Sequence, residues 1–464
     1  MSKELSSNKL GEMPINRLVI TMAGPIILSM LVQALYNIVD SIFLGQSDPA
    51  GNTLTALTIA FPWQNIMISI AVGTGVGINA LLSRFLGEKN YDAANKTASV
   101  GVLLSILSWV GMLLLTFTLI NPFVDMQVSS AAQTDSEVAA NIQIVADYTK
   151  QYLNIVSGAS IGVFLQVCFE RLLQATGKTV LSMLIQLIGA LINIILDPVF
   201  IFTFKMGVAG AALATVIGQI AASLIGFILN RFCNKDIHLS FKEMKPQKEI
   251  ISRIYKIAIP SVVMSSIGSV MTTGINMILM AIKNGGTIAT TIFGLYFKII
   301  SFINMPVFGI NNGIVPIISY NYGAKNKDRI ISTFKISIIY ATVIMIVGLI
   351  IFQSVPDKLI MLFSDNSELI SQGITALRIT SIPFVIVGFC IVSIGCFQAL
   401  DLPNYSLIIS VARQLLVLLP VAYLFSLTGN PENVWWAFPI AEVMSFLFCI
   451  FFALRVYKTK LKNL

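Results

Sequence analysis

The feature of this sequence that most constrains its fold is a succession of apolar runs, each about 20 residues long or longer, separated by polar clusters. A helix needs about 20 apolar residues to cross the hydrocarbon core of a bilayer. Hydrophobic residues make up 56% of the chain and charged residues 11%, and the mean hydropathy is +0.84. Soluble domains carry about twice that share of charge. The sequence therefore predicts an all-α integral membrane protein.

Breaking the sequence at its polar clusters predicts twelve membrane-spanning helices. They lie at about residues 18–44, 54–83, 97–121, 147–175, 179–203, 208–231, 253–282, 287–320, 328–353, 370–399, 405–428 and 433–456. The first run is too long for the apolar region of a cleaved signal peptide, so we expect it to stay as a span. A polar stretch from Asn230 to Ser252 divides the spans into six and six. We therefore expect an N-terminal lobe over 1–232, a cytoplasmic linker over 233–252 and a C-terminal lobe over 253–464.

The distribution of Lys and Arg predicts the orientation of the spans, because these residues stay cytoplasmic in short loops. With the N-terminus inside, 23 of the 30 Lys and Arg residues fall in cytoplasmic segments. The outer segments hold only Lys150, Lys205, Lys283 and Lys358. Both termini are therefore expected in the cytoplasm. The net charge of +8 follows from this topology and gives no reason to expect nucleic-acid binding.

The two sets of six spans carry matching local features. The GxxxG motif of Gly73 and Gly77 recurs 236 residues later as Gly309 and Gly313, and the turn 87–90 recurs at the same offset as 323–326. Pro25 recurs 235 residues later as Pro260. Six is an even number, so both halves enter the membrane from the same side. This predicts two pseudo-symmetric six-helix lobes in a parallel repeat about an axis along the membrane normal, with a cleft between or within the lobes. Such an architecture is typical of transporters and argues against a simple anchor.

Two aspartates lie inside the predicted spans. An aspartate at the centre of a membrane helix costs about 2.5 to 3.5 kcal/mol on insertion scales, and intramembrane acids are functional by default. Asp40 lies about four residues from the outer end of span 1, and Asp197 about six residues from the outer end of span 5. At a rise of about 1.5 Å per residue, their depths agree within a few Å. The two carboxylates could therefore share one site.

Further polar groups lie one helical turn from these aspartates, or one turn from each other in span 6. They are Tyr36, Asn37, Asn193, Thr215 and Gln219. In addition, Pro198 cannot donate to the carbonyl of Ile194, which frees a backbone acceptor. Oxygens of these kinds are the ligands of a hard cation such as Na⁺, and desolvation favours the protonated form of a carboxylate. We predict that this group binds a coupling ion, H⁺ or Na⁺; the alternative is that Asp197 only hydrogen-bonds a neighbouring helix.

The embedded charges of the second half are mainly basic. Lys298, Arg378 and Arg413 lie in spans 8, 10 and 11, and Glu442 lies in span 12. We expect Glu442 to pair with Lys298 or Arg378 and to act mainly in stability. In the first half, Glu170 lies beside Arg171 near the inner end of span 4, where an interfacial ion pair and a functional role both stay open.

Residue types needed for metal or nucleophilic catalysis are scarce. The chain has one histidine, His238, in a polar loop, and five cysteines without paired spacing. The segment 177–179 (GKT) is similar to the end of a phosphate-binding loop, but Leu172 stands where that loop requires a glycine. We expect no enzymatic activity, no cofactor and no transition-metal site.

The chain resembles the multidrug and toxic compound extrusion (MATE) family over essentially all twelve spans, and three segments carry the most specific part of this resemblance. They are residues 36–45 (YNIVDSIFLG), 174–202 (QATGKTVLSMLIQLIGALINIILDPVFIF) and 207–219 (GVAGAALATVIGQ). Within the family, the chain is most similar to the DinF-like branch and to MepA-type multidrug efflux pumps. The resemblance implies two six-helix lobes around a V-shaped cleft that alternates between the membrane faces. It also implies export of amphipathic organic cations from a bacterial cell, driven by inward H⁺ or Na⁺ flow.

The resemblance also implies roles for individual residues. The N-lobe cation site of the DinF-like branch falls on Asp40, Asn193, Asp197 and Thr215, and a cavity tyrosine of that branch falls on Tyr152. The C-lobe acids of the NorM-like branch have no counterpart here, because spans 7 and 10 contain no Asp or Glu in their interiors. The expected partners are therefore small organic cations and membrane lipids, and we expect a monomer. The substrate spectrum and the choice between H⁺ and Na⁺ stay open.

One rival function shares this fold: a flippase for a lipid-linked oligosaccharide or another anionic amphiphile. Such a protein should place basic residues in its cleft against a pyrophosphate. Lys298, Arg378 and Arg413 keep that alternative open.

Overall fold

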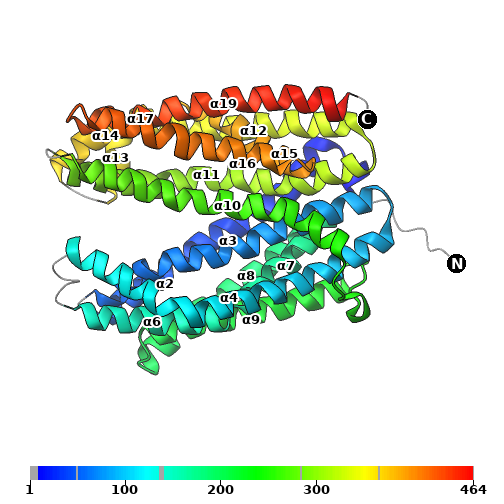
Figure 1. Cartoon of the computed structure of the whole chain (residues 1–464), viewed down its shortest axis with the longest axis horizontal. Coiled ribbons are helices and arrows are strands. Elements are labelled where there is room, and N and C mark those ends of the chain that lie inside the picture. Colours follow the sequence, from blue (N-terminus) through cyan, green and yellow to red (C-terminus); the bar gives the residue numbers. More distant parts are fainter. Residues whose placement is uncertain (1–8, 49–50, 135–140, 283–284, 364–365, 463) are drawn as a thin grey trace. The chain divides into compact units, whose positions relative to one another are not determined.

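The computed structural model describes residues 9–48, 51–134, 141–282, 285–363, 366–462 and 464. Lys3 and Lys283, which count in the charge distribution, lie outside these ranges. The described chain is helical and contains no β-strand (Figure 1). Ten of its helices are long and apolar enough to cross a membrane, or twelve when each of two bent helix pairs is counted as one span. The all-α membrane fold and the twelve predicted spans are thereby confirmed.

The first six spans and the segments that flank them are α1 (Lys9–Glu12), α2 (Ile15–Ser47), α3 (Asn52–Gly87), α4 (Tyr91–Thr134), α6 (Ile142–Gly158) with α7 (Ile161–Ala175), α8 (Thr179–Pro198) with the π-helix η1 (Val199–Thr203), α9 (Val208–Phe232) and η2 (Phe241–Glu243).

The last six spans are α10 (Lys248–Met280), α11 (Gly286–Gly323), α12 (Lys327–Ser354) followed by α13 (Pro356–Met361), α14 (Ser367–Ser381) with α15 (Phe384–Ala399), α16 (Pro403–Val411) with the π-helix η3 (Ala412–Leu418) and α17 (Leu419–Ser426), and finally α18 (Pro431–Val434), α19 (Ala437–Val456) and η4 (Tyr457–Leu461).

The helices form two compact units, and α2 and α10 each pass from one unit to the other. The N-terminal unit comprises Leu28–Leu86 and Asn90–Val262; the C-terminal unit comprises residues 9–27, Gly87–Lys89 and the described chain from Val263 onward. The first part of α2 thus belongs to the C-terminal unit, and the first part of α10 belongs to the N-terminal unit. The predicted linker, 233–252, lies within the N-terminal unit. The lobe boundaries predicted from the sequence do not include this exchange of the first parts of α2 and α10 between the units. The boundaries at 232 and 253 remain a prediction.

The first GxxxG motif brings α3 into backbone contact with α10 inside the N-terminal unit. A Cβ atom added at Gly73 would lie 2.5 Å from Cγ2 of Val262, and one added at Gly77 would lie 2.5 Å from the carbonyl oxygen of Ile254. Real Cβ atoms do not approach other atoms this closely. Small residues are therefore required where these two helices cross.

The second GxxxG motif makes the equivalent contact inside the C-terminal unit, between α11 and the first part of α2. A Cβ at Gly309 would overlap with Ile27, and one at Gly313 would lie 3.0 Å from the Cα of Ala23. The first span of one half thus packs on the second span of the other half, twice and in the same way. This symmetric exchange of contacts supports the predicted duplication.

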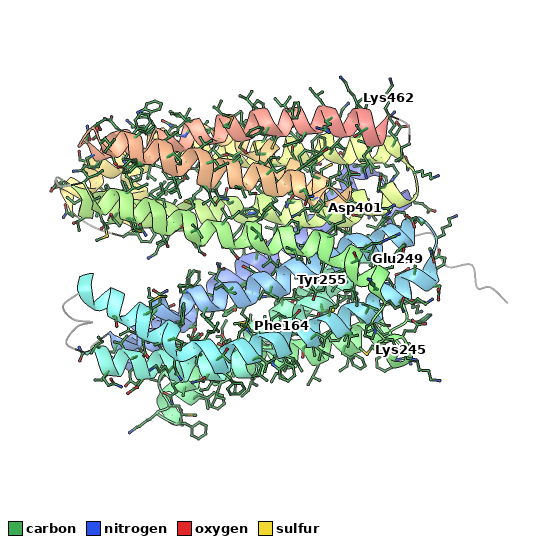
Figure 2. The ribbon with its side chains drawn as sticks, in the orientation of Figure 1. Phe164, Lys245, Glu249, Tyr255, Asp401 and Lys462 are labelled. Carbon is green, nitrogen blue, oxygen red and sulfur yellow. The ribbon has the colours of Figure 1, made fainter. Side chains whose placement is uncertain are left out.

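The turns that follow these glycine helices also repeat. Lys89 and Lys325 both have a φ of 56°, in the left-handed region that L-residues rarely adopt. Asn90 N donates to the Phe85 carbonyl and Asn326 N donates to the Asn321 carbonyl, both at 2.9 Å. Further along, Gly177 (φ 80°) and Asp401 (φ 62°) end the fourth and tenth spans, and Asp401 is labelled in Figure 2.

The fourth and tenth spans are each broken near the middle, which the sequence analysis missed. The axes of α6 and α7 differ by 47°, and those of α14 and α15 by 53°. At the second break, Pro383 has no N–H to continue the helix. At the first break no proline is present; instead, indole N–H groups of Trp109 and Trp63 donate to the Gly158 carbonyl (3.3 Å) and to Ser157 Oγ (3.1 Å). The apolar pattern runs through both breaks, so it predicts continuous spans.

The core of the N-terminal unit joins five of its helices. Buried side chains from α3, α4, α6, α7 and α9 form one cluster, which includes Trp63, Tyr152 and Phe164. Phe164 of α7 is labelled in Figure 2. The helix α9 contacts α6, α7 and α8, and this packing positions the polar residues described next.

Candidate functional site

Asp40 and Asp197 are both buried in the N-terminal unit. Asp40 lies in the part of α2 that belongs to this unit and is 7% exposed, while Asp197 lies near the end of α8 and is fully buried. The two carboxylates are close enough for Asp40 to act electrostatically on Asp197. Oδ1 of Asp40 and Oδ2 of Asp197 are buried without a hydrogen-bond partner among the described residues. Two buried acids therefore offer acceptor oxygens that the protein itself does not satisfy.

Asn193 connects Asp197 to α9. Its Nδ2 donates to Oδ1 of Asp197 and to Oγ1 of Thr215, both at 3.4 Å. These are long, weak hydrogen bonds. Oδ1 of Asn193 and Oε1 of Gln219 are buried without a partner in the described chain. The structure thus brings together three of the four residues that the resemblance assigned to one site, and the fourth, Asp40, lies within electrostatic range of Asp197.

The close approach of α8 and α9 makes this arrangement possible. A Cβ on Gly218 would lie 2.7 Å from the carbonyl oxygen of Gly189, and one on Gly189 would lie 3.0 Å from the Cβ of Ala222. Glycine at both positions allows the backbones to meet. Since Asn193 lies one turn after Gly189 on α8, its short side chain reaches Thr215 on α9.

The backbone is irregular directly after Asp197. Pro198 removes an N–H donor, and the five residues of η1 that follow are π-helical. Single π-helical turns inside α-helices are frequent at functional sites. The carboxylate of Asp197 therefore lies next to backbone that departs from the regular hydrogen-bond pattern, as the sequence around Pro198 predicts.

Two tyrosines lie near the acids, and one of them is held by Gln64, a residue that was not predicted. Asp40 and Asp197 act electrostatically on both Tyr36 and Tyr152. The hydroxyl of Tyr152, which is 3% exposed, accepts a hydrogen bond from Nε2 of Gln64 on α3 at 3.0 Å. Gln64 is not among the residues predicted from the sequence, although an amide inside the second span is a signal of a polar site.

Asn37 and Glu170 are placed differently from their neighbours. The side chain of Asn37 is exposed, so the structure does not add it to the buried group. Glu170 accepts a hydrogen bond from Gln166, which also donates to Gln186, both at 3.0 Å. Arg171 acts electrostatically on Glu170. These contacts support a role for Glu170 in packing within the N-terminal unit.

The charges of the second half are paired differently from the prediction. Glu442 does bind an embedded basic residue, but the partner is Arg413, whose Nη1 lies 2.8 Å from Oε1 of Glu442. Lys298 and Arg378, the two expected partners, have exposed side chains. The expectation failed because helical depth alone was compared. The π-helix η3, which carries Arg413, and the packing of η3 against α19 could not be read from the sequence.

These features define the class of protein. Up to twelve spans in two repeated halves, broken at equivalent helices and holding unsatisfied buried acids, make a polytopic membrane transporter. The chain belongs to the MatE family, because the sequence model of that family matches residues 25–199 and 260–424. No group of three or more His, Cys, Asp or Glu able to hold a metal ion occurs within the part of the chain that the structure describes.

Individual relatives agree with this family. The chain is 29% identical over 438 residues to the multidrug export protein MepA of Staphylococcus haemolyticus, covering 93% of this chain and 91% of the relative. It is 28% identical over 430 residues to MepA of Staphylococcus aureus, with coverages of 92% and 91%. The resemblance to MepA-type pumps is thereby confirmed.

Solved structures agree on the fold. One is described as the outward-facing conformation of a multidrug resistance MATE family transporter of the MOP superfamily; it is 22% identical, with a TM-score of 0.88 and coverages of 98% and 99%. A MOP superfamily transporter from Pyrococcus furiosus gives a TM-score of 0.87 at the same identity and coverages.

Proposed function

We propose that this transporter is an antiporter that exports amphipathic cationic drugs and other toxic organic cations by alternating access, coupled to inward flow of H⁺ or Na⁺. Relatives named for multidrug export support the substrate class. The observation that supports the coupling is the pair of buried carboxylates, Asp40 and Asp197, each with one oxygen that has no partner in the part of the chain that the structure describes. A buried ionised carboxylate without a partner is unstable, so a proton or a cation is needed to neutralise it.

We assign the coupling ion to Asp40, Asn193, Asp197 and Thr215. For Na⁺, these residues would supply carboxylate, amide and hydroxyl oxygens, the ligands that hard cations use. For H⁺, a carboxylate alone would suffice. Tyr36, Tyr152 and Gln219 would line the same group, with Gln64 fixing Tyr152 through its hydrogen bond. No other cofactor is required by this mechanism.

The flippase alternative receives less support from the C-terminal unit. A site for a lipid-linked pyrophosphate needs several uncompensated cations. Arg413 is instead neutralised by Glu442 at 2.8 Å. Lys298 and Arg378 are exposed and come from different helices. We therefore favour a cationic substrate.

The test of coupling uses purified protein in proteoliposomes with a fluorescent organic cation and separately imposed Na⁺ and proton gradients. Transport driven by one gradient identifies the ion. Transport of the cation that is indifferent to both gradients would contradict antiport. Binding of a lipid-linked pyrophosphate with no cation transport would favour the flippase.

We further propose a bacterial plasma-membrane location, with both termini in the cytoplasm and a monomeric state. The chain offers a natural probe of orientation: Cys233 is exposed, and the other four cysteines are buried. Cys233 lies where α9 ends, on the predicted cytoplasmic side. A membrane-impermeant maleimide should label it in everted vesicles and not in intact cells. Cys233→Ser is the control, and labelling of intact cells would reverse the orientation.

A further inference from the structure

The site in the N-terminal unit has a charged counterpart on the repeat-related helices of the C-terminal unit. Asp197 lies on the fifth span, close before the π-helix η1, and its neighbour Asn193 donates both to Asp197 and to Thr215 of the sixth span, α9. Six spans later, Arg413 lies in the π-helix η3 of the eleventh span and contacts Glu442 on the twelfth span, α19. Both halves therefore carry a π-helical turn and embedded charges on the same pair of spans.

The ion pair of Arg413 and Glu442 is incomplete. Only Oε1 of Glu442 is engaged; Oε2 is buried and has no partner within the described residues. The side chains of Arg413 and Glu442 are 26% and 17% exposed. The pair is therefore accessible from one side and under-satisfied on the other, unlike a well-formed structural ion pair.

A cluster of aromatic rings lies near this carboxylate. Phe438 precedes Glu442 by one turn on α19 and makes an edge contact with Tyr296 of α11, with ring centroids 5.7 Å apart. Tyr296 lies within electrostatic range of both Glu442 and Arg413. The ring centroid of Phe293 lies 6.0 Å from that of Phe438, so Phe293 extends the aromatic cluster. A carboxylate beside aromatic faces is the environment that proteins use to bind organic cations.

We propose that Glu442 is the counter-ion for an organic cation bound in the C-terminal unit, and that Arg413 is a resident cation which the substrate displaces. This proposal rests on the proposed export of organic cations. Without substrate, Arg413 neutralises Glu442, which avoids a lone charge inside the membrane. With substrate, the cation takes the carboxylate and stacks on Tyr296 and Phe438, and the guanidinium turns toward its exposed side.

This exchange makes the two members of the pair act in opposite directions. Loss of the Glu442 charge removes the counter-ion and weakens cation binding. Loss of the Arg413 charge removes the competitor and strengthens cation binding. A purely structural ion pair predicts the same sign for both changes, because either one leaves the other charge uncompensated.

The test measures binding of tetraphenylphosphonium to the purified full-length protein, with neutral triphenylphosphine oxide as the matched uncharged probe. Glu442→Gln should weaken tetraphenylphosphonium binding about tenfold, and Arg413→Gln should tighten it about threefold or more. Binding of the neutral probe should stay within about twofold in both variants, because it does not compete for the charge. Glu368→Gln, an exposed glutamate at the start of α14, is the control and should leave both affinities unchanged.

If Arg413→Gln does not fold, the double variant Arg413→Gln/Glu442→Gln provides the test, since it carries no lone charge. It should bind tetraphenylphosphonium about as weakly as Glu442→Gln, and wild-type affinity would overturn the proposal. Equal weakening of both probes, or the same sign for both single variants, would also overturn it. A wild type that exports cations while Glu442→Gln retains full affinity would contradict only this subsite. A wild type that exports no cation under either gradient would contradict the proposed function itself.

Discussion

The fifth and sixth spans and their counterparts, the eleventh and twelfth, carry opposite solutions to the problem of a charge inside a membrane. In the N-terminal unit, Asp197 and Asp40 each keep a buried oxygen without a partner among the described residues, and Asp197 accepts one weak hydrogen bond of 3.4 Å from Asn193. In the C-terminal unit, Glu442 has a resident cation at 2.8 Å. Under the proposed function, the first arrangement takes up a proton or a cation, whereas the second pairs its two charges within the protein.

This difference teaches that duplication preserved the scaffold and not the chemistry. The glycine contacts, the left-handed turns at Lys89 and Lys325, and the broken fourth and tenth spans all recur. The charges do not recur: the fifth span carries Asp197, whereas the eleventh span carries Arg413, paired with Glu442 on the twelfth. A scaffold of two similar halves can thus assign ion coupling to one half and leave the other for a different partner.

The largest expected effect comes from removing the unsatisfied charge. Asp197→Asn keeps the shape of the side chain and removes the ionisable group, and burying a neutral amide costs less than burying a charge. The variant should therefore insert and fold normally and bind substrate, while gradient-driven efflux falls to the level of protein-free vesicles. Asp40→Asn should act in the same direction and more mildly. Dye transport in proteoliposomes measures both.

The control for this experiment is Asp147→Asn, at an exposed aspartate of α6, which should transport normally. Normal gradient-driven efflux by a well-folded Asp197→Asn protein would end the coupling role of Asp197. It would also remove the contrast between the two units, because the N-terminal acid would then be structural as well.

The next effect tests the part that the two halves share. Gly77→Ala places a Cβ 2.5 Å from the backbone oxygen of Ile254, which cannot rotate away, so we expect about 1 to 3 kcal/mol of destabilisation. Gly313→Ala meets the Cα of Ala23 at 3.0 Å and should be milder. Thermal unfolding in detergent ranks the variants. Gly111→Ala, which has no atom within 4 Å of the added Cβ, is the control; equal stability of all three would contradict the packing described.

A smaller effect is expected from breaking the ion pair of the C-terminal unit. Glu442→Gln leaves Arg413 without its partner. Because both side chains are partly exposed, the expected loss is about 1 to 2 kcal/mol, below the value for a fully buried pair. The unfolding midpoint should fall by a few degrees, and Arg413→Gln/Glu442→Gln should recover most of it. The coupling ion should stay the same. An unchanged midpoint combined with lost gradient dependence would place Glu442 in the coupling site and erase the contrast between the units.

The sequence predicts the scaffold better than the charge pairing. Hydrophobic run length and the matched GxxxG motifs were enough for the twelve spans and the repeat, because both signals are local. The cluster of Asn193, Asp197 and Thr215 was also accessible, since two members share a helix face and the family motif supplies the third. The partner of Glu442 was not, because it depends on which helices pack together and on the π-helix η3 that carries Arg413.

The breaks in the spans show the same limit. The bend at Pro383 has a local cause that a careful reading of the sequence could have found. The bend after Gly158 has no such local cause. The carbonyl of Gly158 accepts its hydrogen bond from Trp109, which lies on another helix. A tertiary hydrogen bond leaves no periodic signal in the sequence around the break.

The smallest expected effect concerns the edge of the N-terminal site. Thr215→Val keeps the shape of the side chain and removes the oxygen that accepts from Asn193 at 3.4 Å. Since the bond is long and one of two that Asn193 makes, its loss should raise the half-saturating concentration of the coupling ion about twofold to tenfold without changing which ion is used. Thr118→Val, at an exposed position of α4, is the matched control. An unchanged ion dependence would exclude Thr215 as a ligand and reduce the site to the two aspartates and Asn193. Complete loss of coupling would instead show that the hydroxyl of Thr215 is a direct ligand. A Na⁺ site requires such a ligand, and a proton site does not.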